Sequence, residues 1–280
     1  MASHYELVIP NVDIPFKMFE FEGKDGHYKR ENHWHRSVEI VAIFEGQLEI
    51  IRKEGVVLLS SGSFAIINSN EIHAISAPTA NKTAVIQIPL QAFEAYFTGE
   101  QFIRFAHNTH EKDQNLMASI QDMYQAYEQK ELGYEFLVKS QFFAIIYLLI
   151  TQYREVNVDE ASLRLNNKMR HLSKITDYIK AHYQSELSLE QLAQHFGYAP
   201  TYLSRMFQRY GGINYKSFLL SIRVEYAYQE LVNSQHQIAD IAANHGFPNS
   251  KSFAAAFRKR YGMLPSEYRK EKEQETTIDR

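Results

Sequence analysis

Residues 189–198 read LEQLAQHFGY and residues 238–247 read IADIAANHGF, and the two stretches share one pattern at a constant offset of 49 positions. In each, apolar residues spaced three apart are followed by a small alanine and then by a glycine. This spacing is typical of an amphipathic helix that ends in a tight turn. A stretch with basic residues follows each glycine, as far as Arg209 and Arg260. The repeat therefore predicts two helix-turn-helix units, a motif that inserts its second helix into the major groove of DNA.

The first unit has the features expected of a base-reading helix. Ser188 and Gln191 form a capping-box pattern, and Pro200 stands at the expected start of the second helix, with Leu203 and Phe207 facing inward. The positions expected to touch DNA are Thr201, Tyr202, Ser204, Arg205, Gln208 and Arg209. Arg205 is the strongest base reader, because one guanidinium can bond guanine O6 and N7 together. Gln208 and Arg209 fit phosphate contacts better.

The second unit has the same skeleton with one extra residue after the glycine, so that Phe207 corresponds to Phe257. Its positions expected to touch DNA are Ser250, Lys251, Ser252, Arg258 and Lys259. Ala254 and Ala255 are expected to be exposed, and they cannot donate hydrogen bonds. This unit is therefore expected to grip phosphates and thymine methyl groups more than to discriminate bases. The two second helices would enter successive major grooves, about 34 Å apart.

Charge separates the chain into two parts. The chain has 280 residues and a net charge of −3, but residues 169–270 hold 13 Lys and Arg against 7 Asp and Glu, while the remainder is acidic. A basic C-terminal third fits a nucleic-acid-binding domain beside one that binds something else. The chain has no cysteine, which excludes disulfides, zinc–thiolate sites and cysteine nucleophiles.

Residues 1–95 are expected to form a β-barrel or sandwich. Short apolar or alternating runs are separated by turn signals at Glu45-Gly46, Glu54-Gly55, Ser61-Gly62 and Asn68-Ser69-Asn70. The runs are Val38–Phe44, Gln47–Arg52, Val56–Leu59, Ser63–Asn68 and Thr83–Ile88. Short strands at this spacing are typical of all-β domains.

Residues 112–155 are expected to form a helical hairpin with its loop at Gly133. The second helix is apolar on more than one face, in the run Phe142–Ile150. Its surplus apolar surface predicts a homodimer, although burial within one chain would explain it equally well. No signal peptide or membrane span is expected, since the longest apolar run has nine residues, which predicts a cytoplasmic protein.

The C-terminal hundred residues resemble the DNA-binding domain of AraC/XylS-type transcriptional regulators. Three stretches carry the resemblance: LSLEQLAQHFGYAPTYLSRMFQRYGG (187–212), IRVEYAYQELV (222–232) and IADIAANHGFPNSKSFAAAFRKRYGMLPSEYR (238–269). Carried over by position, the resemblance implies base contacts at Thr201, Ser204 and Arg205, and near Lys251 and Ala255. The family often has a larger, basic side chain at the last of these positions.

The N-terminal part has a second dense feature, His33-Trp34-His35-Arg36-Ser37-Val38-Glu39. On one strand, His33, His35 and Glu39 would point to the same face, and His73 could join them from a later strand. The spacing His-x-His, three residues, Glu, six residues, Gly resembles the first cupin motif, whereas the second motif is degraded. Three interpretations stay open: a polar floor that binds a small effector, structural histidines, or a divalent metal site, for which these four residues are the candidates.

Together these features predict a two-domain α+β protein. Residues 1–155 would form a cupin-like effector-binding and dimerisation domain, 156–168 a linker, 169–270 an all-α DNA-binding domain with two helix-turn-helix units, and 271–280 a charged tail. The predicted function is a transcription regulator without enzymatic activity or cofactor. Its partners would be double-stranded promoter DNA, a second copy of the chain, and an effector for which a sugar is favoured because cupin-bearing relatives commonly sense sugars. The alternative is a metal-dependent cupin enzyme that carries a regulatory helix-turn-helix module.

Overall fold

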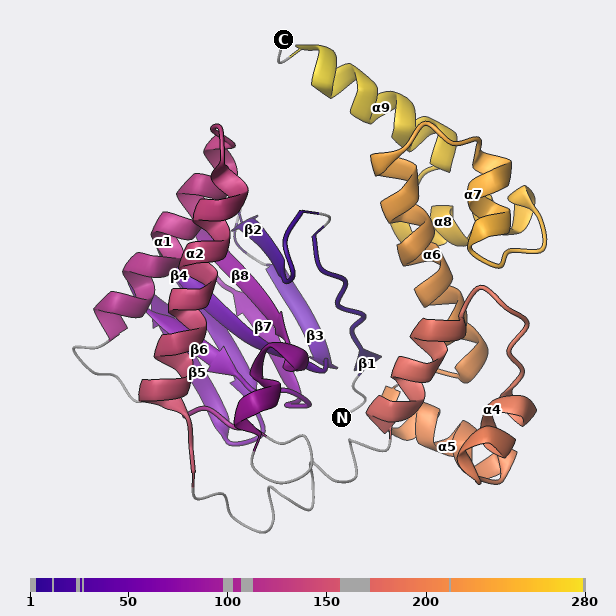
Figure 1. The fold of residues 1–280 in the computed structure, drawn as a ribbon, viewed down its shortest axis with the longest axis horizontal. Coiled ribbons are helices and arrows are strands. Elements are labelled where there is room, and N and C mark those ends of the chain that lie inside the picture. Colours follow the sequence, from indigo (N-terminus) through magenta and orange to yellow (C-terminus); the bar gives the residue numbers. More distant parts are fainter. Residues whose placement is uncertain are drawn as a thin grey trace. The chain divides into compact units, whose positions relative to one another are not determined.

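The chain forms two compact units, Met1–Arg170 and His171–Arg280, in a computed structural model (Figure 1). The structure describes residues 4–11, 13–23, 26, 28–97, 103–106, 113–156, 172–211 and 213–278. The linker expected at 156–168 lies outside the described residues except for Val156. Each unit is described by itself.

The first unit is built on a curled sheet of eight strands. Its strands are β1 His4–Tyr5, β2 Lys17–Gly23, β3 Tyr28–Trp34, β4 Ser37–Arg52, β5 Gly55–Ser60, β6 Phe64–Ile67, β7 His73–Ala77 and β8 Asn81–Pro89. The order is β1-β3-β7-β4-β8-β2, with β5 and β6 also paired to β4. All these pairings are antiparallel except that of β1 with β3. The sheet follows half of a barrel wall, so the expected all-β architecture is confirmed in this open form.

The long strand β4 corrects one expectation. The turn expected at Glu45-Gly46 is wrong, because β4 continues through it with a register shift between Ile43 and Glu45. Gly46 has a φ of 77°, and a Cβ at this position would overlap the Ala80 carbonyl oxygen. Glycine therefore permits a bend inside one strand, and the two halves of β4 serve different parts of the sheet.

Helices cover one face of the sheet (Figure 1). A 3₁₀ helix, η1 Leu90–Tyr96, follows the last strand, and the expected hairpin is present as α1 Asp113–Gln129 and α2 Tyr134–Leu148, extended by a π turn, η2 Leu149–Tyr153. Gly133, with a φ of 84°, joins the two long helices. The Phe142 ring stacks on Phe16 at 4.2 Å, so α2 is fixed to the sheet by aromatic packing.

One side of α2 does not pack within the first unit. Phe136, Leu137, Phe143 and Tyr147 are exposed, by 51% or more of their surface, although all four are large and apolar in part. The stretch Tyr134–Tyr153 is long and apolar enough to cross a membrane by length and composition alone. Because core helices of water-soluble proteins pass the same test, this remains weak evidence for a membrane.

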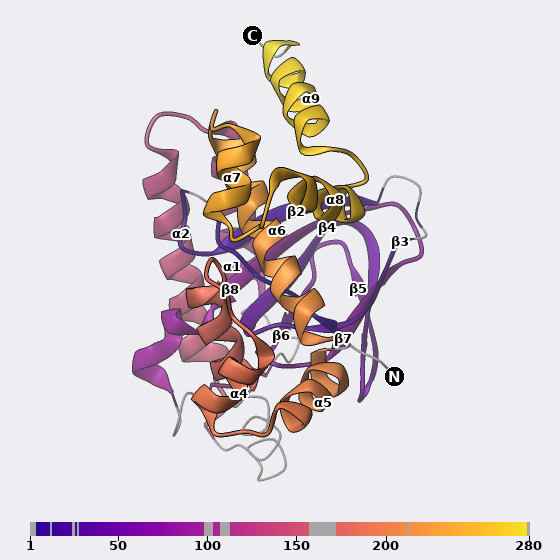
Figure 2. The same cartoon turned by 90° about the vertical axis from the view of Figure 1, so that its right-hand side faces the viewer.

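The second unit is helical (Figure 2). A helix over residues 172–182 is followed by α4 Leu189–Phe196, α5 Pro200–Gly211, α6 Tyr215–Asn233, α7 Ile238–Asn244, α8 Ser250–Tyr261 and α9 Pro265–Ile278. α6 runs between the α4–α5 pair and the α7–α8 pair. The ring of Phe207 on α5 packs against Phe218 at the start of α6, whereas Leu231 near its end belongs to the core around α7 and α8. The charged stretch expected as a tail from residue 271 is helical as far as Ile278.

Candidate functional site

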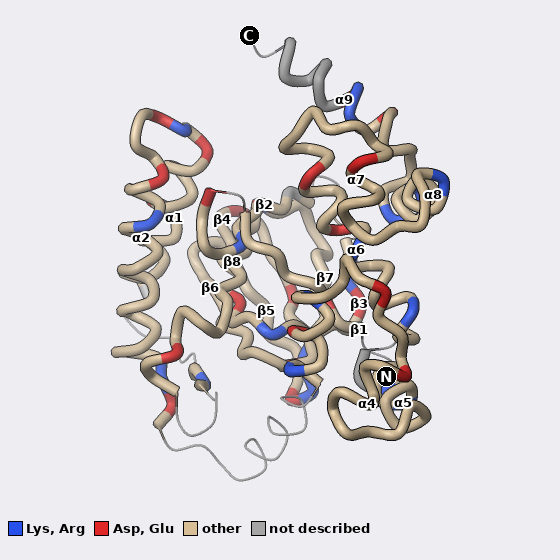
Figure 3. The backbone as a smooth tube through the Cα atoms, turned by 45° about the vertical axis from the view of Figure 1, so that its right-hand side comes forward, with Lys and Arg blue, Asp and Glu red and all other residues tan. Residues whose placement is uncertain are grey.

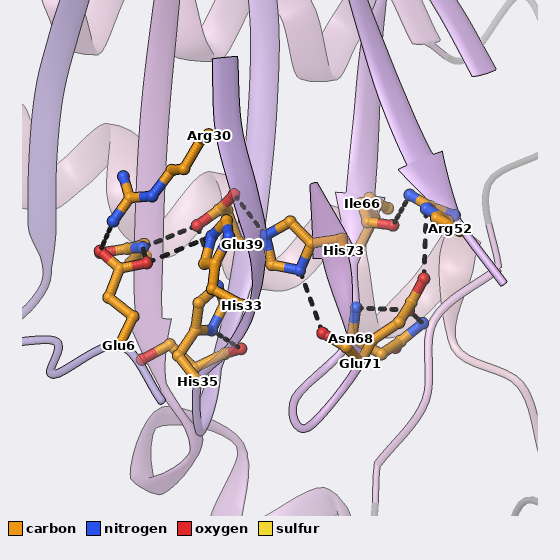
Figure 4. A network of polar contacts seen from close by, with 12 residues as sticks. Glu6, Arg30, His33, His35, Glu39, Arg52, Ile66, Asn68, Glu71 and His73 are labelled. Atoms are coloured by element: carbon orange, nitrogen blue, oxygen red, sulfur yellow. Dashed lines mark hydrogen bonds and ion pairs between the residues drawn. The ribbon is translucent and has the colours of Figure 1, made fainter. Parts of the chain in front are cut away.

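The four residues singled out by the His-x-His motif meet at one buried point of the sheet (Figure 4). Nε2 of His35 lies 3.0 Å from one Glu39 oxygen, and Nε2 of His73 lies 3.6 Å from the other. One ring nitrogen from each of His33, His35 and His73 lies within 4.8 Å of the others. We call His33, His35, Glu39 and His73 the His–Glu cluster.

The expectation that residues 33–39 form one strand is wrong. β3 ends at Trp34 and β4 begins at Ser37, so His33 and Glu39 belong to different strands and His35 to the connection between them. β7, which starts at His73, lies between β3 and β4. Sheet topology, and not the alternation of one strand, brings these side chains together.

Backbone carbonyls fix the orientation of all three imidazoles. Nδ1 of His33, His35 and His73 lies 3.0 Å from the carbonyl oxygens of Glu31, Ser37 and Glu71, respectively. A carbonyl oxygen can only accept, so each Nδ1 carries a proton. Each Nε2 therefore faces the cluster, where a neutral ring offers a lone pair and a charged ring offers a second proton.

Glu6, Arg30 and Gln87 complete the cluster, and the sequence analysis did not single them out. Gln87 pairs with Glu39 across β8 and β4, and its Nε2 donates to Glu39 at 2.7 Å and to Glu6 at 3.4 Å. Glu6 follows β1, is buried, and lies 2.8 Å from the Arg30 guanidinium. Gln87 has a sequence signal, since it is the polar residue within the apolar run 84–88, but Glu6 has none because its partners are distant in the chain.

Burial and charge set the protonation states. Burial, with help from His73, lowers the pKa of His33 to about 3, so this ring is neutral. Burial alone would lower the pKa of His35 and raise that of Glu39, but their mutual attraction reverses both shifts. Burial would also raise the pKa of Glu6, but Arg30, His35 and Lys17 together outweigh burial and lower that pKa. The cluster therefore holds two carboxylates that are balanced by cations.

These donors can serve two kinds of chemistry. Three Nε2 atoms and a carboxylate match the ligands of a divalent transition metal, and Nδ1–H groups bonded to carbonyls are typical supports for such ligands. The same groups can instead hydrogen-bond a polar organic molecule. The oxygen Oε1 of Gln87 is buried without a hydrogen-bond partner, which leaves bonding capacity in the cluster.

The first helix-turn-helix unit has the expected construction. Ser188 Oγ accepts from the Gln191 backbone N–H at 3.1 Å and Gln191 Oε1 accepts from the Ser188 N–H at 2.8 Å, so the capping box is formed. Gly197 ends α4 with a φ of 72°, and α5 begins at Pro200. Of the positions expected to touch DNA, Ser204 is half-buried and the others are exposed: Thr201, Tyr202, Arg205, Gln208 and Arg209.

The second unit presents a basic helix (Figure 3). Asn249 caps α8 by accepting from the Ser252 N–H at 2.8 Å, and Phe253 and Phe257 are buried. Lys251, Arg258 and Lys259 are exposed, while Ser250 and Ser252 are half-buried. Ala255 is exposed as expected, but Ala254 is half-buried because it lies beside the buried face of α8.

A buried polar network links the first part of the second unit to its second helix-turn-helix. The Tyr183 hydroxyl lies 2.9 Å from Nδ1 of His245, whose Nε2 lies 2.6 Å from a Glu230 oxygen on α6. Arg223 of α6 donates to the carbonyl oxygens of Tyr183 and Ser185, both at 2.8 Å. These bonds join the end of helix 172–182 to α6 and to the turn after α7.

Two family models match the chain. An AraC-like ligand binding domain matches residues 19–146, and a helix-turn-helix domain matches residues 192–271. The His–Glu cluster lies within the first match, and α5 and α8, the second helices of the two helix-turn-helix units, lie within the second.

The chain is similar to curated bacterial regulators. It is 25% identical over 234 residues to an uncharacterised HTH-type transcriptional regulator of Staphylococcus aureus, covering 81% of this chain and 30% of that protein. The chain thus spans about a third of the length of the first such relatives. It is 23% identical over 281 residues to the melibiose operon regulatory protein of Escherichia coli, covering 91% of this chain and 88% of that one.

A solved structure shares the fold. ToxT of Vibrio cholerae superposes with a TM-score of 0.54 at 16% identity, over 91% of this chain and 97% of that one. At this identity the likeness establishes the two-part fold alone.

Proposed function

Because the chain belongs to the AraC-type transcription regulators, we propose that it binds specific promoter DNA through its second unit in response to a small molecule bound at the His–Glu cluster. The observation that carries the proposal is the pair of helix-turn-helix units on one connecting helix. α5 offers the guanidinium of Arg205 on its exposed face, and α8 offers the cations of Lys251, Arg258 and Lys259. We propose the cytoplasm as its location, because a bacterial promoter lies there.

Selection from random duplex DNA tests the proposal. The full chain should enrich one sequence with two elements about one helical turn apart, because two recognition helices on one face enter successive major grooves. A pool that shows no common sequence after repeated rounds would contradict sequence-specific binding.

The proposed effector site is the His–Glu cluster, and a sugar is the proposed effector class. Hydroxyl groups both donate and accept, so they suit a cluster that offers imidazole nitrogens, carboxylates and an amide together. The name of the Escherichia coli relative refers to a sugar operon, which supports this class. ToxT has in contrast been solved with an unsaturated fatty acid, so this fold accepts effectors of different chemistry.

The proposed oligomer is a homodimer through the exposed face of α2. Phe136, Phe143 and Tyr147 recur at three to four residue spacing with Ser140 among them, so they lie on one side of the helix. Exposed aromatic side chains that form one stripe are typical of contact surfaces.

A metal centre is the second candidate role of the His–Glu cluster, favoured by the close approach of three imidazoles. The organic effector stays the first proposal for this cluster, and a bound metal would have to displace the protons from the Nε2 atoms that ligate it. Elemental analysis of the full chain purified without added metal, beside His35→Ala, measures this. Iron, manganese, nickel or zinc at one per chain in the parent and lost in the variant would instead support a metal-dependent cupin.

A further inference from the structure

Glu6 differs from the rest of the cluster in its origin. It follows β1, a strand of two residues that pairs with β3 at the edge of the sheet, whereas His33, Glu39 and Gln87 come from longer strands. It also lies before residue 19, where the match to the ligand-binding family model begins. Figure 4 shows its carboxylate pointing into the network between Arg30 and His33.

The surroundings of the Glu6 carboxylate are those of a bound anion. Oε1 lies 2.8 Å from the Arg30 guanidinium and 3.8 Å from Lys17 Nζ, and Oε2 accepts from Gln87 Nε2 at 3.4 Å and lies 3.4 Å from His33 Nε2. Glu6 is 8% exposed, and the Arg30 and Lys17 side chains are 29% and 28% exposed. Without this carboxylate, two partly buried cations and an amide N–H would face a space of carboxylate size, which strongly favours another anion.

We propose that Arg30, Lys17 and Gln87 form a carboxylate subsite of the effector site, which Glu6 fills until the carboxylate of a sugar acid displaces it together with β1. This inference rests on the proposed function, in which the cluster receives a sugar-like effector. The hydroxyl groups of the sugar acid would meet the imidazoles of the His–Glu cluster. The effector would therefore compete with a side chain of the protein itself.

The segment to be displaced is short. β1 makes two register pairs with β3, the Glu6 N–H donates to the Trp34 carbonyl oxygen at 2.8 Å, and the Tyr5 ring packs on Trp34. Glu6 acts as an intramolecular ligand, whose effective concentration for a short tether is in the millimolar range. Effector affinity should consequently rise when Glu6 is shortened.

The chain carries its own reporter of this displacement. Trp34 is the single tryptophan of the sequence, is fully buried, and meets the Tyr5 ring edge-on at 4.7 Å. Departure of β1 removes Tyr5 and exposes one side of the indole to water. Its fluorescence emission should then shift to longer wavelength.

The test uses the full chain with sodium glucuronate, sodium acetate, sodium phosphate and glucose, at ionic strength matched with sodium chloride. Glucuronate and acetate should shift Trp34 emission, while glucose should not. Affinities follow from the rise of Tm with ligand concentration. Glu6→Ala should bind glucuronate at least about tenfold more tightly than the parent, with Glu6→Gln between them, because the competing carboxylate is removed or neutralised. Glu54→Ala, which removes an exposed charge at the β4–β5 turn, should equal the parent.

Each of the following results would contradict the carboxylate subsite without contradicting the proposed function. Equal glucuronate affinity in the parent and Glu6→Ala would mean that Glu6 is a structural partner of Arg30. If Glu6→Ala does not fold, the comparison of Glu6→Gln with the parent decides the same point. Glucose binding as tightly as glucuronate, or phosphate more tightly than acetate, would refute the carboxylate assignment. DNA selection is a separate measurement, so its failure would contradict the regulator and leave these affinities intact.

Discussion

Arg205 and Arg209 lie one helical turn apart on α5, but they are expected to act differently on DNA. Arg205→Ala should cost about 1–3 kcal/mol at the selected site and relax the preference at one base pair, because a bidentate contact to guanine is lost. Arg209→Ala should weaken selected and random DNA alike and lower the salt dependence of log K by about one unit, because a phosphate contact is lost. Fluorescence anisotropy with both DNAs at several salt concentrations measures the two effects.

Each arginine variant serves as the matched control for the other, since both remove one exposed guanidinium from the same helix. An equal loss on selected and random DNA for Arg205→Ala would contradict its role as a base reader.

His245 and Glu230 predict how pH affects the second unit. Burial holds the pKa of His245 below 6.5, although Glu230 opposes this shift. Burial would raise the pKa of Glu230, but hydrogen bonds from His236, Asn244 and His245 hold it below 4.5. At a pH between the folded and the ordinary pKa of either group, the unfolded chain binds more protons than the folded chain. The free energy of unfolding therefore falls as pH drops from about 6.5 to below 4.5.

Urea unfolding of the full chain followed through this pH range measures the effect. His245→Phe, which introduces the residue found at the matching position 196 of the first unit, should flatten the upper part of the range because phenylalanine does not titrate. An unchanged pH dependence in this variant would assign the effect to other groups.

At the residue level, the sequence predicted those site residues that carry a local pattern. The His-x-His and Glu spacing identified three members of the cluster, and His73 was added from a later strand. Amphipathic spacing separated the buried phenylalanines from the exposed residues of α5 and α8. Glu6 could not be predicted, because its role depends on which strand is placed beside β3. The half-buried state of Ala254 likewise depends on the packing of α8 and not on its own sequence.

Among the elements, α2 makes the sharpest prediction about assembly. Phe143→Asp should convert a dimer into a monomer, because a carboxylate at the centre of the exposed aromatic stripe would have to be desolvated on association. Light scattering of the full chain over a range of concentrations measures the mass. Gln125→Asp, a substitution at an exposed position of α1, should leave the dimer intact. A monomeric parent chain at every concentration would contradict the α2 interface.

Elements with a strong apolar period were predictable, and polar elements were not. β3 has the sequence YKRENHW, in which one face is exposed to solvent and the other carries His33. No apolar run therefore marks this strand in the sequence. The end of α9 contains Glu, Lys and Gln, which favour helix without any apolar stripe. The bend in β4 has the same Glu-Gly signal as a hairpin turn, and pairing with β8 across that point decides between them.

For the whole molecule, charge asymmetry and the change of hydrophobic period predicted two parts of different kinds. A dimer through α2 would bring four recognition helices to one DNA, and each added contact after the first would be intramolecular. The proposed effector would act in the first unit, where its carboxylate would replace that of Glu6 at Arg30.

α6 also limits how the sequence of this protein can change. Its 19 residues, from Tyr215 to Asn233, separate the two helix-turn-helix units by about 28 Å at 1.5 Å per residue. Inserting or deleting one residue within α6 would turn everything beyond it by about 100° around the helix axis. If both helices bind one side of a duplex as proposed, α8 would then face away from the side that α5 contacts. On this proposal, substitutions along α6 can accumulate, but insertions and deletions within it cannot.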